Sequence, residues 1–192
     1  MPHHHDDHPR GGIFPHRITR FRQNRAAAAP EAGFAAGRRL ADQLDTPQAQ
    51  RDLSISLNNV GDVARDLGDL DTAATHYQQA LDINRRLAQQ LDTDQAHRDL
   101  GWALTQLGDV ARDLGDPTIA RIHHQQALDI NRRLAEQLGT ARALRDVHSG
   151  LSGLTQIEEE LGDTEAAAAL RAELTTVSDQ LAALDDGTPD PS

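Results

Sequence analysis

A repeat of 47 residues constrains this sequence more than any other feature. The triplet Arg51-Asp52-Leu53 recurs as Arg98-Asp99-Leu100, and again as Arg145-Asp146-Val147, at the same spacing both times. Residues 51–97 and 98–144 are identical at 30 of 47 positions. Periods of roughly 20 to 50 residues are typical of solenoids, in which each unit buries its apolar face only against its neighbours. We therefore expect a stack of similar units.

Each unit is predicted to hold two helices, because its apolar residues recur with a helical period. In the first unit they form two stripes: Leu53, Leu57, Val60, Ala64 and Leu67, then Ala73, Tyr77, Ala80, Leu87 and Leu91, the second stripe interrupted by the polar Asn84. Glycine suited to end a helix recurs at 68, 115 and 162, and Thr46-Pro47, Asp116-Pro117 and Gly139-Thr140 place capping residues at helix starts. The predicted helices are 31–44, 47–67, 71–91, 94–114, 117–138, 141–161 and 164–184.

The predicted fold class is all-α, an α-solenoid of antiparallel helix pairs. It would have about seven helices, three full repeats and a partial N-terminal one, since Arg38-Arg39-Leu40-Ala41 matches Arg85-Arg86-Leu87-Ala88. The alternative is a closed helical bundle, which would not require nearly identical units in register. The regular repeat favours the solenoid.

These residues resemble the tetratricopeptide repeat family. The match rests on its signature of large apolar, glycine, small and aromatic positions, found here as Leu57, Val60-Gly61, Ala64, Gly68, Ala73, Tyr77 and Ala80. The second unit has Leu104, Leu107-Gly108, Ala111, Gly115, Ala120, His124 and Ala127, whereas the third has Thr155 in place of the packing glycine and Arg171 in place of the ring. The resemblance covers about residues 31–185 and implies a helical scaffold that binds proteins.

Two departures from the family pattern define a subtype. The unit is 47 residues long instead of about 34, and the proline that usually closes a unit is missing near Arg85 and Arg132. Long units of this kind resemble those of kinesin light chain and of bacterial signalling proteins. Some family members clamp a C-terminal carboxylate with asparagine and lysine, but Asp62 and Asp109 stand where the asparagine would be, and the chain has no lysine. That binding type is not expected.

The sequence divides into three expected parts: a disordered segment at 1–30, the helical repeat domain at 31–185, and a disordered tail at 186–192. His3, His4, His5 and His8 in the first segment form only a weak metal-binding pattern, so no metal site is predicted. The helix expected at 31–45 has no partner helix before it, and three covers for its apolar face stay open: the N-terminal segment, a second copy of the chain, or sequence missing from a truncated gene. The acidic last unit is typical of a solenoid end.

Composition narrows the function further. The chain has no cysteine, which excludes disulfides, thiolate metal sites and cysteine nucleophiles. The net charge of −11 disfavours nucleic acid and anionic membranes as partners. No apolar run is long enough to cross a bilayer. The use of arginine without lysine suggests a GC-rich bacterial genome, and the absence of cysteine fits a cytoplasmic location.

The predicted partner-binding surface is the polar face of the first helix of each unit, because the family resemblance implies that these helices line a concave groove. Its candidate residues are Arg51, Ile55, Asn58, Asp62, Arg65, Arg98, Trp102, Thr105, Asp109, Arg112 and Arg145. Trp102 is the only tryptophan and is the expected anchor, since tryptophan and arginine are enriched at binding hot spots. The alternatives are that Trp102 packs between neighbouring first helices and that the charges pair with one another.

Three functions compete for this sequence. A protein-interaction module, without catalytic residues or cofactor, explains the repeat best. An enzyme or metal protein is disfavoured, since the sequence has no phosphate-binding loop, serine elbow or His-x-x-x-His pair within the predicted helices. The third function, a truncated or self-associating fragment of a larger bacterial regulator, stays open as an alternative. Self-association would form a homo-oligomer through residues 31–45. The identity of the partner is not encoded in any motif.

Overall fold

The computed structural model describes residues 38–39, 43–44 and 46–186, and in these residues it contains α-helices and no strand. Residues 47–186 contain six helices: α2 (Pro47–Asp66), α3 (Leu70–Leu91), α4 (Asp94–Asp113), α5 (Pro117–Leu138), α6 (Ala141–Leu161) and α7 (Thr164–Asp186). Their ends lie within two residues of those predicted. The helix predicted at 31–44 falls largely outside the described residues, although 38–39 and 43–44 are helical. The segments predicted as disordered, 1–30 and nearly all of 186–192, also lie outside them.

The helices start where the sequence supplies a capping side chain. Thr46, Thr93 and Thr140 precede the first helix of each unit, and each hydroxyl accepts a hydrogen bond from the backbone N–H three residues later, at 3.2–3.3 Å. Asp69 and Asp116 cap α3 and α5 in the same way, at 3.2 and 3.0 Å. Such caps satisfy backbone donors that a helix leaves unpaired at its N-terminus.

The turn between the helices of a unit depends on glycine. Gly68, Gly115 and Gly162 have φ angles of +77°, +83° and +77°, a left-handed conformation that residues with a Cβ rarely adopt. The predicted helix-ending glycines are thus confirmed. The turn between units is less strict, since the left-handed position is Gly139 after α5 but Asp92 after α3.

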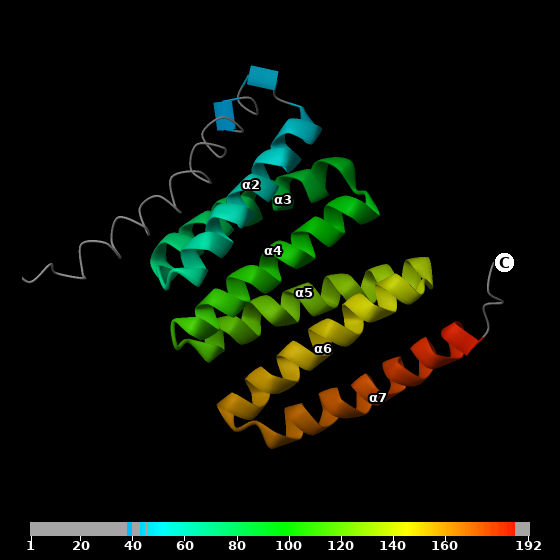
Figure 1. Ribbon diagram of the computed structural model, residues 1–192. Coiled ribbons are helices and arrows are strands. Elements are labelled where there is room, and N and C mark those ends of the chain that lie inside the picture. The colour runs from blue at the N-terminus through cyan, green and yellow to red at the C-terminus, as the bar shows by residue number, and fades with distance from the viewer. Residues whose placement is uncertain (1–37, 40–42, 45, 187–192) are drawn as a thin grey trace, which may run out of the picture.

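The helices form an open stack in which each one packs mainly against the next along the chain. Figure 1 shows this arrangement running from α2 at one end to α7 at the other, with these two helices far apart. The largest core cluster combines Ala64 of α2, Tyr77 of α3, Leu104 of α4 and Leu134 of α5, so a continuous apolar core joins the first two units. The solenoid is therefore confirmed, and the closed bundle is not formed.

A glycine–ring contact sets the spacing within each of the first two units. A Cβ built on Gly61 would lie 2.6 Å from the Tyr77 ring, and one on Gly108 would lie 2.5 Å from the His124 ring. In the third unit, Thr155 replaces this glycine and Arg171 replaces the ring. Thr155 is buried, whereas Arg171 is exposed and pairs with Glu159, so the third unit has no glycine–ring contact at these positions.

Candidate partner-binding surface

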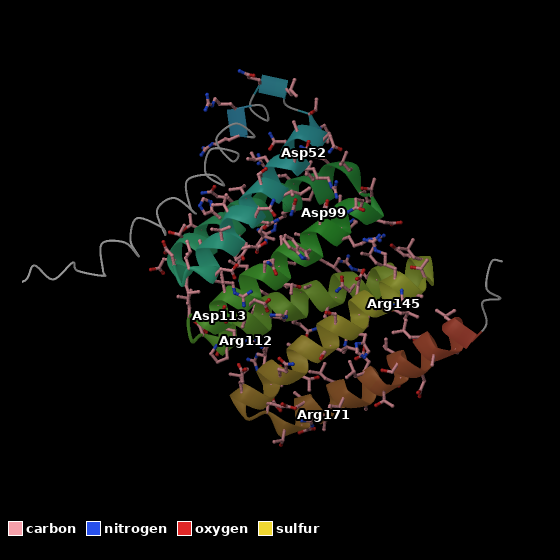
Figure 2. The ribbon with its side chains drawn as sticks, viewed as in Figure 1. Asp52, Asp99, Arg112, Asp113, Arg145 and Arg171 are labelled. Atoms are coloured by element: carbon pink, nitrogen blue, oxygen red, sulfur yellow. The ribbon has the colours of Figure 1, made fainter. Side chains whose placement is uncertain are left out.

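The first helices α2, α4 and α6 lie side by side and are joined by ion pairs between units. Arg51 of α2 contacts Asp99 of α4 at 2.6 Å, and Arg65 contacts Asp113 of α4 at the same distance. Figure 2 labels Asp99 and Asp113 toward opposite ends of α4. These guanidinium groups connect neighbouring units, so they are already engaged by this chain.

The boundary between the second and third units, where α4 faces α6, repeats only part of this pattern. Arg112 of α4, the equivalent of Arg65, contacts Gln156 at 3.3 Å and Glu160 at 4.0 Å on α6. Arg98, the equivalent of Arg51, forms no ion pair with any described residue, and its Nε is buried without a hydrogen-bond partner. The two boundaries therefore differ in which charges remain available.

The two predicted aspartates are tied to the rings of their own units. Asp62 accepts hydrogen bonds from the Tyr77 hydroxyl at 2.7 Å and from Gln106 at 3.0 Å. Asp109 contacts His124 Nε2 at 3.0 Å and Arg65 at 3.6 Å.

The same contacts shift the pKa values of these groups. Burial and the Asp62 hydrogen bond raise the pKa of Tyr77. Burial alone would raise the pKa of Asp109, but the His124 hydrogen bond and the nearby positive charges, including Arg65, lower it. Asp109 therefore stays ionised and fixed in its place.

Trp102 lies on a ridge between two cavities of this surface. Its side chain is 46% exposed, unusually open for a tryptophan. A cavity of about 300 Å³ separates α2 from α4, and a cavity of about 430 Å³ separates α4 from α6; Trp102 lines both. Trp102 is therefore exposed at the edge of both cavities and is not packed in the core.

The smaller cavity combines apolar walls with an amide floor. Ile55, 43% exposed, and Trp102 form its walls, and Asn58 and Asn84 lie beneath them, 2% and 1% exposed. Asn84 donates a hydrogen bond to the backbone oxygen of Asp99, yet the Oδ1 atoms of both asparagines are buried without a partner. Asn58, predicted as a groove residue, is thus at the bottom of a pocket instead of on an open face.

The larger cavity exists because α6 carries small residues where α4 carries larger ones. Ser149, Gly150 and Gly153 line it, and their equivalents in the preceding unit are Trp102, Ala103 and Gln106. Gln106 fills the α2–α4 boundary and bonds to Asp62, whereas Gly153 leaves the edge of His124 next to open space. The replacement of these three side chains by a serine and two glycines enlarges the cavity at the α4–α6 boundary.

Several residues of this surface were not anticipated as site residues. These are Arg142, Gly150 and Gly153, which line the larger cavity. Of the residues that the sequence did predict, Arg145 is exposed on α6, and Thr105 is half-buried and donates a hydrogen bond from its hydroxyl to the Gly101 oxygen. Comparing the third unit with the second position by position, and noting where side chains shorten, would have indicated the cavity.

The described residues contain no group of three or more histidine, cysteine, aspartate or glutamate side chains arranged to hold a metal ion. The histidines of residues 3–8 lie outside them. In the same part of the chain, no helix is long and apolar enough to cross a membrane.

Comparison with known proteins supports one family. Two tetratricopeptide repeat models match the sequence, one over residues 52–110 and the other over residues 100–137. A search of curated proteins found no match.

Solved structures with a similar helical arrangement include BtubC (BKLC) from P. vanneervenii, at 15% identity, covering 88% of this chain and 95% of that one, with a TM-score of 0.31. A de novo designed helical repeat protein shares 13% identity over 85% of this chain and 99% of that one, with a TM-score of 0.39. A designed 16-helix transmembrane nanopore shares 16% identity over 88% of this chain and 66% of that one, with a TM-score of 0.43.

Proposed function

Because the chain belongs to the tetratricopeptide repeat family, we propose that it is a non-catalytic interaction module that binds a segment of a partner protein across α2, α4 and α6. The segment would cross the ridge at Trp102 and enter the cavities on either side of it. The proposal includes a bacterial, cytoplasmic setting, in keeping with a chain that uses arginine without lysine and has no cysteine.

The exposure of Trp102 between two cavities is the observation that carries this proposal. A tryptophan side chain exposed to water gains free energy when a partner covers it, and central aromatic residues dominate many interfaces. The neighbouring cavities offer space for side chains on both sides of such an anchor. Most other polar groups of this face are bonded within the chain, so they define its shape more than they supply free contacts.

The proposal is tested by selecting binding peptides from a random display library with the full chain as bait. Selected peptides are then measured against Trp102→Ala and against Ile122→Ala. Ile122 is a matched control, because it is also 46% exposed but lies on α5, outside the lining of both cavities. Circular dichroism confirms that both variants remain helical.

The expected result is a loss of at least about tenfold in affinity with Trp102→Ala, equivalent to about 1.4 kcal/mol, and no change with Ile122→Ala. Peptides that bind equally well to both variants, or that depend on Ile122 alone, would show that the binding surface lies elsewhere. Failure to select any peptide from a large library would also count against the proposal.

A further inference from the structure

We propose that the cavity between α4 and α6 binds an acidic side chain of the partner segment, with Arg98 and Arg142 as its cationic contacts. This inference rests on the proposed function and specifies the chemistry of the partner. It follows from three observations: the cavity is larger than its equivalent between α2 and α4 and is lined by arginine, these arginines form no ion pair with any described residue, and two of the three carboxylates that line it are paired.

The cavity differs from its equivalent at the other boundary. Arg98, Arg142, Trp102 and Ser149 line its sides, and glycines at 150 and 153 open its α6 wall. The smaller cavity between α2 and α4 is its equivalent, because Ile55, Asn58 and Asn84 of that cavity correspond to Trp102, Thr105 and Asn131 of this one, but no arginine lines the smaller cavity. A volume of about 430 Å³ is within the range of small-ligand pockets, roughly 300–1,000 Å³, so a carboxylate side chain with its backbone fits.

The arginines of this cavity are not used by the chain itself. Arg51 pairs with Asp99 at 2.6 Å, but its equivalent Arg98 forms no ion pair with Asp146, the equivalent of Asp99, or with any other described residue. Arg142 is exposed at the rim and likewise has no ion pair in the described part of the chain. The buried, unbonded Nε of Arg98 is a donor whose desolvation an incoming carboxylate oxygen would offset.

The carboxylates near the cavity do not cancel these charges. Asp99 is paired with Arg51, and Asp109 with His124 and Arg65. Asp146 is the exception, because it lines the cavity without an ion pair among the described residues. Two unpaired guanidinium groups therefore face one unpaired carboxylate, a local positive balance within a chain of net charge −11. An anion is favoured here and disfavoured over most of the remaining surface.

The occupant is inferred to be an acidic side chain within a peptide, rather than a free anion or a chain end. The cavity opens beside Trp102, at the ridge where the proposed segment crosses. A segment that passes over an aromatic ridge can place one side chain in the adjacent hollow while its backbone continues along the surface.

The test uses the full chain and the fluorescence of Trp102, its only tryptophan, as the reporter. The first probe is a capped pentapeptide with a central glutamate between glycine and serine residues. The matched probes are the same peptide with glutamine, the glutamine peptide with a free C-terminal carboxylate, and inorganic phosphate. Because the tryptophan lies at the cavity edge, occupancy is expected to change its emission.

The expected result is a saturable signal with the glutamate peptide and binding at least about tenfold weaker for each other probe. Arg98→Gln and Arg142→Gln should each weaken glutamate-peptide binding at least about threefold, and Arg85→Gln, which changes charge equally on the exposed side of α3, should not. Asp146→Asn should strengthen binding, because it removes the opposing charge. Arg98→Gln breaks no ion pair, so the variant is expected to fold normally.

Equal binding of the glutamate and glutamine peptides would overturn the inference, as would preference for the free carboxylate or phosphate. The same holds if Arg98→Gln leaves binding unchanged. These failures are distinguishable from failure of the proposed function. Display-selected peptides that require Trp102 but contain no acidic residue, and ignore Arg98→Gln, would refute the acidic-side-chain inference and leave the interaction module in place.

Discussion

The sharpest prediction concerns two glycines that approach the same ring from opposite sides. His124 is 4% exposed and lies between Gly108 of α4 and Gly153 of α6. A Cβ on Gly108 would lie 2.5 Å from His124 Cδ2 and 2.9 Å from its Nε2, whereas a Cβ on Gly153 would lie 3.4 Å from Nδ1 and 3.5 Å from Cε1. The first contact is impossible without movement, and the second is an ordinary one.

The two alanine substitutions should therefore change stability in opposite directions. In a helix interior, alanine is more favourable than glycine by about 0.5–1 kcal/mol, and Gly153→Ala should gain about that amount. Gly108→Ala should gain the same but lose about 1–3 kcal/mol from overpacking. Displacing His124 also breaks its hydrogen bond with Asp109, which adds about 1–2 kcal/mol. The net effect of Gly108→Ala is a loss of about 1–4 kcal/mol.

The measurement is urea unfolding of both variants and the wild type, followed by circular dichroism, together with amide hydrogen exchange. Hydrogen exchange is informative because units of a repeat array can open separately, and the loss should be concentrated in α4 and α5. A Gly108→Ala variant as stable as Gly153→Ala would refute the idea that the glycine–ring contact sets the spacing of the unit.

Three further predictions concern single groups. The pKa of Asp109 is lowered, so its contribution to stability is complete above its ordinary pKa of 3.8 and is lost as the pH falls through the lower folded-state value. Asp109→Asn should therefore flatten the pH dependence of the unfolding free energy in that acid range. A pH dependence equal to that of the wild type in urea melts would contradict this. Asn58→Thr introduces the residue found at the equivalent Thr105 and removes a buried, unbonded Oδ1, so the thermal midpoint should rise by an amount corresponding to about 1 kcal/mol, whereas an unchanged or lower midpoint would argue against an unsatisfied group. Gly115→Ala should destabilise by about 1–2 kcal/mol, because φ is +83°; its control is Gly139→Asp, which copies Asp92 and should lower the midpoint less in the same melt.

The agreement between predicted and observed helices has a local cause. Helix starts at Thr46, Thr93 and Thr140 depend on a side chain and a backbone N–H three residues apart, and the turn after α2 depends on one glycine. Such features are encoded within a few neighbouring positions.

The candidate site was predictable only in part. The helical period placed Trp102 on the exposed side of a first helix, where the structure has it. The period cannot indicate how closely the next helix approaches. Asn58 is buried for that reason, although it lies only three residues from the exposed Ile55. Ion pairs are equally hard to predict. Arg51 and Arg98 occupy equivalent positions, but among the described residues only Arg51 forms an ion pair with the aspartate of the next unit.

The sequence by itself determined the repeat, the helices, their caps and the family, because all of these depend on short-range spacing that is copied from unit to unit. Tertiary structure alone decided where the surface is hollow and which charges stay unpaired. Those properties arise at the boundary between α4 and α6, where residues about 50 positions apart meet. The size of the cavity there depends on smaller side chains on α6, which lie at positions where the repeat is not preserved.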